Sequence, residues 1–480
     1  MFSAPDSIII YVRIHVRITE RKGHMAKDMS HEAHYQKMAE APVSRLVLTL
    51  AFPSIITMTI SSIYNMADTF FVSQISISAS GAVGIVFSVM AIIQAIGFSL
   101  GMGSGSLVSR YLGAKETWKA DTAASVGFFS ALTIGALVMI GGTLFQAALI
   151  RFLGATDTIS GYAQSYAHYI LFAAPLMCAA YQMNNVLRSE GKAALGTIAM
   201  TTGGILNIIL DPIFIFGLHM EIAGAAIATA LSQSVSFLIL LYMYLSGRSS
   251  IHLSIRRLPG NMGILWQIIV VGFPSLCRQG LASLASVVTN RAVRPYGDAA
   301  IAAMSIISRV VHFQGSVVRG LSQGCQPVAG FNYGAKRYRR VYDATRFTMV
   351  LGSVFMLAVS IVFFLWAPGV MRLFCRGDAE VVSVGTLALR AYSFAAPLTG
   401  LITTISMVLQ STGQSGRATL LSCCRQGLFL LPMLVLLPPR FGLPGVQLAQ
   451  PLADVLTFCV SLPLYFLFIR ELLALERQPL

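Results

Sequence analysis

Twelve long apolar segments limit what this chain of 480 residues can fold into. A membrane-spanning helix needs about 20 mostly apolar residues, and each segment can supply one. Only 11% of the residues are charged, against about 25% in soluble domains, so a water-soluble fold of this length would lack surface polarity. We therefore predict an all-α polytopic membrane protein. The expected spans are 46–73, 79–108, 122–149, 161–188, 194–217, 223–246, 264–292, 300–328, 342–368, 384–411, 417–437 and 445–469.

Basic residues gather in every second loop between these spans. Cytoplasmic loops of membrane proteins are enriched in lysine and arginine, so this alternation predicts that the even-numbered loops and both termini are cytoplasmic. The net charge is +15, but the positions of the basic residues are those that orient a chain in the cell (inner) membrane, so we expect no nucleic-acid partner. The basic residues concerned are Arg110, Lys115, Lys119, Arg188, Lys192, Arg248, Arg256, Arg257, Lys336, Arg337, Arg339 and Arg340.

The first residues do not read as a secretory signal. Their apolar run is interrupted by Arg13 and Arg17, whereas a signal peptide needs an unbroken apolar core of about 7–15 residues. We expect residues 1–44 to form a cytoplasmic segment and the natural start to be Met25 or Met29.

The chain also repeats itself. Five segments recur in the same order, and each second copy follows the first by 221 or 222 residues. This predicts two homologous six-helix bundles in parallel orientation, an N-lobe at 45–250 and a C-lobe at 251–480. Parallel repeats of this kind are typical of transporters. The matched segments begin at Ala51 and Gly272, Arg110 and Phe331, Leu171 and Ser393, Val186 and Val408, and Gly224 and Gly445.

Two acidic residues mark a functional site in the first repeat. Asp68 and Asp211 lie inside spans, where an ionisable side chain is costly and indicates function by default. Asn207 is four residues before Asp211 and shares its helix face. Pro212 cannot donate a backbone hydrogen bond and should disturb the helix locally. The alternative is that the two acids only join helices together.

The second repeat has a different set of polar residues. Asp454 lies in the last span without an acidic counterpart in the first repeat, and Arg278 and Arg291 lie in the seventh span. Arginines at such depth pair with an acid or extend toward the interface, so either arginine could pair with Asp454.

Pro53 interrupts the first span and is a candidate hinge.

Several segments together resemble the multidrug and toxic compound extrusion (MATE) family, in its bacterial multidrug efflux branch. They are "YNMADTFFVSQI", "GAK", "RSEGK", "NIILDPIF" and "GAAIATALSQ", within a likeness that runs from about 45 to 470. The resemblance implies a cation site formed by Asp68, Asn207, Asp211 and Thr229, and a helix that bends at Pro53. It also implies that Tyr64 and Asn184 line a substrate cavity.

The resemblance is incomplete in the second repeat. Another branch of the family carries an acidic ion site in the seventh span, where this chain has Arg278 and Gln279. We therefore expect ion coupling in the N-lobe, and a polar C-lobe site of another kind formed by Arg278, Gln279 and Asp454.

The implied activity is antiport by alternating access of the two lobes. Such a monomeric transporter exports cationic amphipathic compounds across the lipid bilayer in exchange for H⁺ or Na⁺, which would bind at the Asp68 site, and needs no cofactor or other metal. The alternative within the same superfamily is a flippase or exporter of lipid-linked oligosaccharides or polysaccharides. An enzyme is not expected, because His168, His219 and His312 are scattered over the chain rather than clustered as catalysis requires.

Overall fold

The computed structural model describes residues 32, 35–153, 157–258, 262–374 and 378–477. Met25 and Met29, and nearly all of the predicted cytoplasmic segment 1–44, lie outside these residues. The regular structure of the described residues is helical, and twelve of the helical segments are long and apolar enough to cross a membrane. This confirms the predicted all-α architecture and the number of spans.

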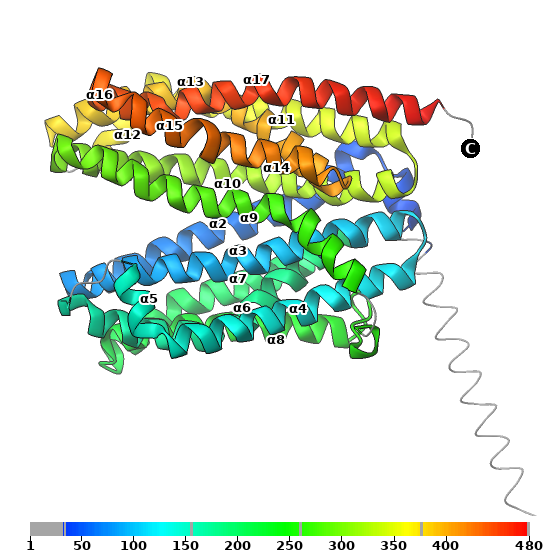
Figure 1. Cartoon of the computed structure of the whole chain (residues 1–480), viewed down its shortest axis with the longest axis horizontal. Helices are drawn as coiled ribbons and strands as arrows, with labels where there is room; N and C mark the ends of the chain where they lie inside the picture. The colour runs from blue at the N-terminus through cyan, green and yellow to red at the C-terminus, as the bar shows by residue number, and fades with distance from the viewer. Residues whose placement is uncertain (1–31, 33–34, 154–156, 259–261, 375–377, 478–480) are drawn as a thin grey trace, which may run out of the picture.

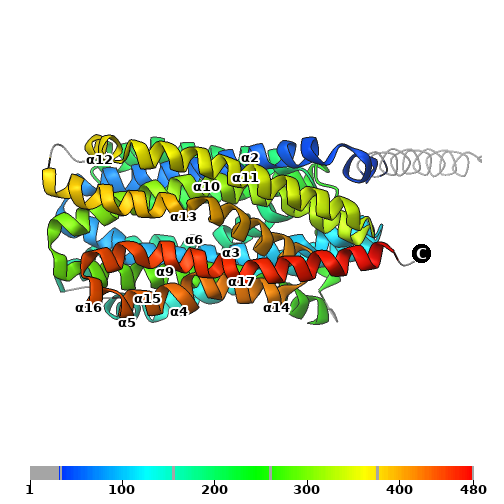
Figure 2. The ribbon, with the colours of Figure 1, turned by 90° about the horizontal axis from the view of Figure 1, so that it is seen from above.

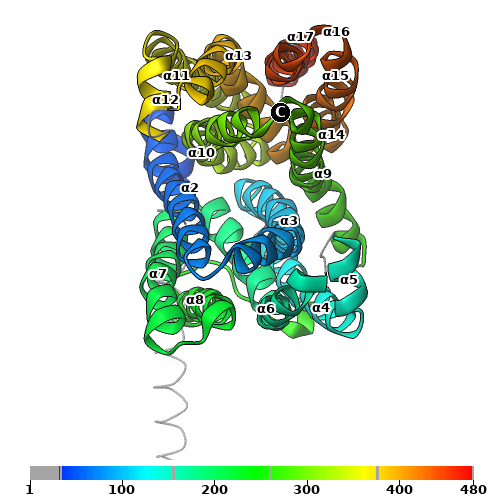
Figure 3. The same ribbon diagram turned by 90° about the vertical axis from the view of Figure 1, so that its left-hand side faces the viewer.

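The first six spans form one bundle, which we call the N-lobe (Figure 3). In the third and fifth spans a long helix is followed by a short one, α5 after α4 and η1 after α7. The elements are α2 (Val43–Ser73), α3 (Ile77–Gly113), α4 (Thr117–Leu144), α5 (Gln146–Phe152), α6 (Asp157–Ser189), α7 (Ala193–Pro212), η1 (Ile213–Gly217) and α8 (Glu221–Leu245).

The last six spans form the second bundle, the C-lobe, which lies beside the first (Figure 3) and in front of it in the view from above (Figure 2). Its fifth span is broken into four pieces. The elements are η2 (Ile255–Arg257), which precedes the bundle, then α9 (Met262–Val293), η3 (Arg294–Tyr296), α10 (Asp298–Gly334), α11 (Tyr338–Leu365), α12 (Ala367–Phe374), α13 (Ala379–Ser411), α14 (Ser415–Cys423), η4 (Cys424–Leu430), α15 (Leu431–Leu436), α16 (Pro438–Phe441) and α17 (Leu443–Glu476).

Two π-helical turns interrupt the spans beside prolines. The turn η1 directly follows Pro212, and η4 ends just before Pro432. Proline lacks the amide hydrogen that a regular turn would use, and π-turns are frequent at functional sites. The disturbance predicted at Pro212 is therefore a π-helical turn, whereas the longer turn η4 was not predicted.

The sequence repeat is visible in the backbone of equivalent loops. Lys115 and Lys336, at the ends of the two "GAK" motifs, both adopt positive φ angles, of 60° and 58°. Gly191 and Gly413 occupy the equivalent turns after α6 and α13, with φ angles of 81° and 88°. Glycine adopts this left-handed conformation without steric cost. The repeated motifs thus encode the same helix-ending turns in both lobes.

The lobes pack together at one end of the molecule and diverge toward the other (Figure 1). We call the first the basic end, because it carries the loops with Lys115, Lys192, Arg248 and Lys336. There the helices approach so closely that a Cβ on Gly324 would lie 2.4 Å from the Ala51 Cα, and one on Gly334 would lie 2.0 Å from the Arg110 carbonyl oxygen.

Candidate functional site

Three of the residues expected in the cation site are joined by hydrogen bonds inside the N-lobe. The Asn207 amide donates to the Asp211 carboxylate, with an Nδ2–Oδ1 distance of 3.1 Å, and to the Thr229 hydroxyl at 3.2 Å. Asn207 and Asp211 share one face of α7, and Thr229 faces them from the neighbouring α8. All three side chains are buried.

Asp68 approaches this group from α2. It is 9% exposed, and its carboxyl group interacts electrostatically with that of Asp211. The structure therefore brings all four predicted residues together. We call Asp68, Asn207, Asp211 and Thr229 the acidic cluster.

Tyr166 of α6 belongs with the acidic cluster, although the sequence analysis did not select it. Its side chain is fully buried and lies within electrostatic reach of both Asp68 and Asp211. The available signal was weak. Among the spans of the described residues, that of Tyr166 is the least apolar and is largely buried. A low mean hydropathy in a buried span indicates polar side chains that face the interior of the bundle.

The acidic cluster has more oxygen atoms than donors. Among the described residues, no hydrogen-bond partner is present for three buried acceptor atoms, Asp68 Oδ1, Asp211 Oδ2 and Asn207 Oδ1. Buried polar atoms are normally paired, and exceptions call for an explanation. Carboxylate and carbonyl oxygens are ligands of hard cations, and a proton on either carboxyl group would supply a donor. The cluster therefore suits a bound cation or protons.

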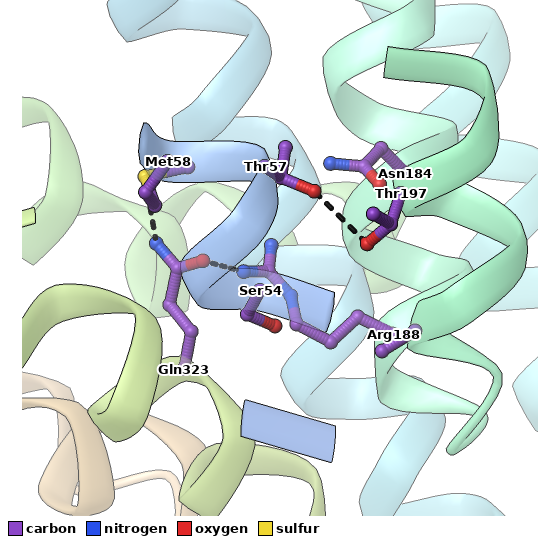
Figure 4. A pocket seen from close by; sticks show the side chains of 8 residues that line it. Ser54, Thr57, Met58, Asn184, Arg188, Thr197 and Gln323 are labelled. Atoms are coloured by element: carbon purple, nitrogen blue, oxygen red, sulfur yellow. Dashed lines mark hydrogen bonds between the residues drawn. The ribbon is translucent and has the colours of Figure 1, made fainter. Parts of the chain in front are cut away.

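The two expected cavity residues lie in different surroundings. Tyr64 is buried beside Asp68 and within reach of Tyr181, so it borders the acidic cluster. Asn184 instead lines a small pocket with Arg188 and Gln323 (Figure 4).

Arg188 was expected in the loop after the fourth span, but it lies in the last turn of α6. This residue is buried, 5% exposed, and its guanidinium donates to the Gln323 side chain of the C-lobe (Figure 4). It also donates to the Asn185 side chain of its own helix. A basic residue next to a loop motif is ambiguous in sequence, because the motif does not reveal that the helix end is covered by the other lobe.

Pro53 is held by contacts between α2 and α7. Its carbonyl oxygen accepts hydrogen bonds from the Thr57 hydroxyl at 3.1 Å and the Thr197 hydroxyl at 2.9 Å. The hydroxyl oxygens of Thr57 and Thr197 are hydrogen-bonded to each other at 2.9 Å (Figure 4). Because this carbonyl has two side-chain donors, a change in the shape of α2 at Pro53 would alter its contact with α7.

The polar residues of the C-lobe are arranged differently from the expectation. Asp454 pairs with Arg425 of η4, with an Oδ1–Nε distance of 2.7 Å, and accepts a hydrogen bond from Gln450 at 2.9 Å. Neither Arg278 nor Arg291 is its partner. Arg425 lies in the eleventh predicted span and was not predicted as the partner, although an arginine inside a span is itself an indication of function.

Arg278 and Gln279 diverge because successive residues of a helix point about 100° apart. Arg278 donates to the Ser275 hydroxyl at 3.0 Å and interacts electrostatically with Arg425. For Gln279, a hydrogen bond joins its backbone carbonyl to Ser283. Among the described residues, no hydrogen bond or salt bridge joins Arg278, Gln279 and Asp454 to one another.

We expect the Arg425–Asp454 pair to be essential for stability. Asp454→Asn should lower the free energy of unfolding by about 3 kcal/mol or more, because it leaves a largely buried arginine without its counter-ion. The double variant Arg425→Met with Asp454→Leu should recover most of the loss, since it removes both charges. Thermal unfolding of the purified protein measures this, and equal stability of Asp454→Asn and the natural protein would contradict it.

Comparisons with known proteins find relatives over nearly the whole chain. The MatE family model matches residues 53–213 and 274–436, once in each lobe. The multidrug export protein MepA of Staphylococcus haemolyticus (strain JCSC1435) is 26% identical over 443 residues, which cover 92% of this chain and 97% of the relative.

Solved structures resemble the whole fold. One is an outward-facing conformation of a multidrug resistance MATE family transporter of the MOP superfamily, with 27% identity and a TM-score of 0.86 over 92% of this chain and 98% of that one. Another is a crystal structure of MATE in complex with MaL6, with 26% identity and a TM-score of 0.86 over 92% of this chain and 99% of that one.

Proposed function

Because the chain belongs to the MATE family, whose model matches both of its lobes, we propose that it exports cationic amphipathic compounds in exchange for H⁺ or Na⁺. Membership makes it a multi-pass membrane transporter rather than an enzyme. We further propose that it works as a monomer and needs no cofactor other than the coupling ion.

The acidic cluster is the observation that carries this proposal. Asp68 and Asp211 are buried, interact with each other and lie among oxygen atoms that lack donors. Two neighbouring buried carboxylates are costly unless a cation or protons neutralise them. A coupling ion and a cationic drug would both be attracted by this negative charge, so binding of one would favour release of the other.

We propose that the basic end faces the cytoplasm, in line with the enrichment of basic residues in cytoplasmic loops. With that orientation the lobes are closed on the cytoplasmic side and diverge on the outer side, which is an outward-facing arrangement. Alternating access would then move residues 45–250 against residues 251–480 around the middle of the membrane.

Neutralisation of the acidic cluster would be coupled to the shape of α2. Asp68 and Pro53 lie on this one helix, and the Pro53 carbonyl contacts Thr197 of α7, the helix that carries Asp211. When an ion binds in the outward-facing state, α2 would bend at Pro53, alter its contacts with α7 and narrow the space left for the substrate. The drug would then leave to the outside.

Separate ion gradients test the coupling. Everted membrane vesicles that contain the protein should accumulate a fluorescent cationic dye when a proton gradient or a sodium gradient, imposed alone, drives exchange. Accumulation with only one of the two gradients identifies the coupling ion. Accumulation with neither gradient, in vesicles shown to hold both, would overturn the antiport proposal.

A further inference from the structure

Three arginines of the C-lobe gather within the membrane-spanning helices. Arg278 lies on α9, which packs against α10, the helix of Arg319, and against η4, the turn of Arg425. The three guanidinium groups lie within electrostatic reach of one another. We call these three residues the arginine cluster. Guanidinium groups remain charged at all physiological pH values, so the cluster concentrates three positive charges.

The cluster holds fewer acids than arginines. Asp454 pairs with Arg425, but among the described residues no carboxylate forms a salt bridge with Arg278 or Arg319. Arg278 donates to the Ser275 hydroxyl. Its buried Nη1 has no hydrogen-bond partner among the described residues. Arg319 donates only to neutral oxygens, the His312 carbonyl at 3.1 Å and the Ser316 hydroxyl at 2.8 Å.

This excess of charge is not explained by stability. Ionisable groups inside a membrane protein are costly and are usually paired, and the three arginines also repel one another. Ordinary packing would favour apolar side chains at these positions. An anion is the missing partner that would satisfy both Arg278 and Arg319.

The cluster reaches the boundary between the lobes. Ser316, which accepts from Arg319, is hydrogen-bonded to Ser62 of α2 in the N-lobe at 3.2 Å. Gly315 leaves room for the Arg319 side chain, since a Cβ there would lie 2.9 Å from Nη1. A ligand between the lobes would therefore meet positive charge on the C-lobe, and the acidic cluster supplies negative charge in the N-lobe.

We propose that the arginine cluster binds an anionic group of the substrate, a carboxylate or a phosphate. Arginine matches both groups with two parallel hydrogen bonds. This inference rests on the proposed export function and extends its substrates to zwitterionic amphipathic compounds. Their positive end would face the N-lobe and their negative end the C-lobe.

A matched pair of dyes tests the inference. Tetramethylrhodamine carries a free carboxylate, whereas its methyl ester is a cation of nearly the same shape. Fluorescence polarisation with the purified full chain should show that Arg278→Gln and Arg319→Gln each weaken binding of the free acid by about tenfold, the size expected for one charge-assisted hydrogen bond. Binding of the ester should stay unchanged or become tighter, which also shows that the variants are folded.

Arg390→Gln is the control, because this exposed arginine of α13 donates to the Phe364 carbonyl and lies outside the cluster. It should leave binding of both dyes unchanged. Equal weakening of acid and ester by the cluster variants, or no weakening of the acid, would overturn the inference. If the cluster variants weaken binding of the acid but not of the ester, and vesicles nevertheless show no export, the result counts against the proposed function alone.

Dihexanoyl phosphatidate distinguishes two sources of the anion. If it displaces the free acid from the natural protein but not from Arg278→Gln, the cluster also accepts a lipid phosphate. If it does not compete, the site is restricted to carboxylate compounds. Both results support an anion site, and displacement that is equal in the natural protein and both variants would contradict it.

Discussion

Asp68→Asn is expected to reduce dye export to the level of vesicles that lack the protein. The amide keeps the size of the side chain but can neither release a proton nor provide a negative charge. Asp68 is the α2 member of the acidic cluster, so its charge is the link between ion binding and the helix that carries Pro53. Export in everted vesicles, normalised to the amount of protein in the membrane, is the measurement.

The matched control is Asp343→Asn. Asp343 forms a surface pair with Arg339 four residues earlier on α11, at 3.7 Å, and its side chain is 46% exposed. Exposed pairs of this kind contribute little, so export should remain near that of the natural protein. Export by Asp68→Asn at the natural rate would remove Asp68 from the coupling mechanism.

The second large effect is expected from Gly324→Ala, at the close approach of α10 and α2. An added Cβ would lie 2.4 Å from the Ala51 Cα and 2.4 Å from its amide nitrogen. These are backbone atoms, so the lobes must separate at the basic end. Overpacking costs about 1–3 kcal/mol, which corresponds to a shift of about 5- to 150-fold in the balance between closed and open forms.

Spin labels at Lys115→Cys and Lys336→Cys report this separation, since the two exposed loops belong to opposite lobes. In the Gly324→Ala background, the distance between the labels should shift to longer values, and export should fall. Gly84→Ala is the control, because nothing lies within 4 Å of its added Cβ and alanine favours a helix over glycine by about 1 kcal/mol. An unchanged label distance in Gly324→Ala would show that this contact does not hold the lobes together.

Sequence alone predicted the features that depend on local composition. Apolar length gave the twelve spans. The repeated motifs predicted two similar bundles, and equivalent turns at Lys115 and Lys336 are found in both. The spacing of Asn207 and Asp211 placed both on one helix face, and they are hydrogen-bonded there. Such features need only helix geometry and hydrophobicity.

Contacts between distant helices could not be predicted in the same way. Tyr166 joins the acidic cluster from α6, and Arg425 rather than Arg278 pairs with Asp454. Which side chains meet across helices depends on the rotation of each helix and on irregular turns such as η4. Arg188 shows the same difficulty, because its burial depends on contact with Gln323 of the other lobe.

The ion pair of the C-lobe has a consequence for how the two halves of the chain diverged. Gln450, which donates to Asp454, follows Thr229 of the acidic cluster by 221 residues, so the ion pair borders a position equivalent to one member of the N-lobe site. There the cation is Arg425, a permanent part of the polypeptide. The N-lobe site would exchange its cation with the surroundings, whereas the C-lobe carries its cation as the side chain of Arg425. Since loss of Arg425 alone would strand a buried carboxylate, a second exchangeable site could not arise through that single step without loss of stability.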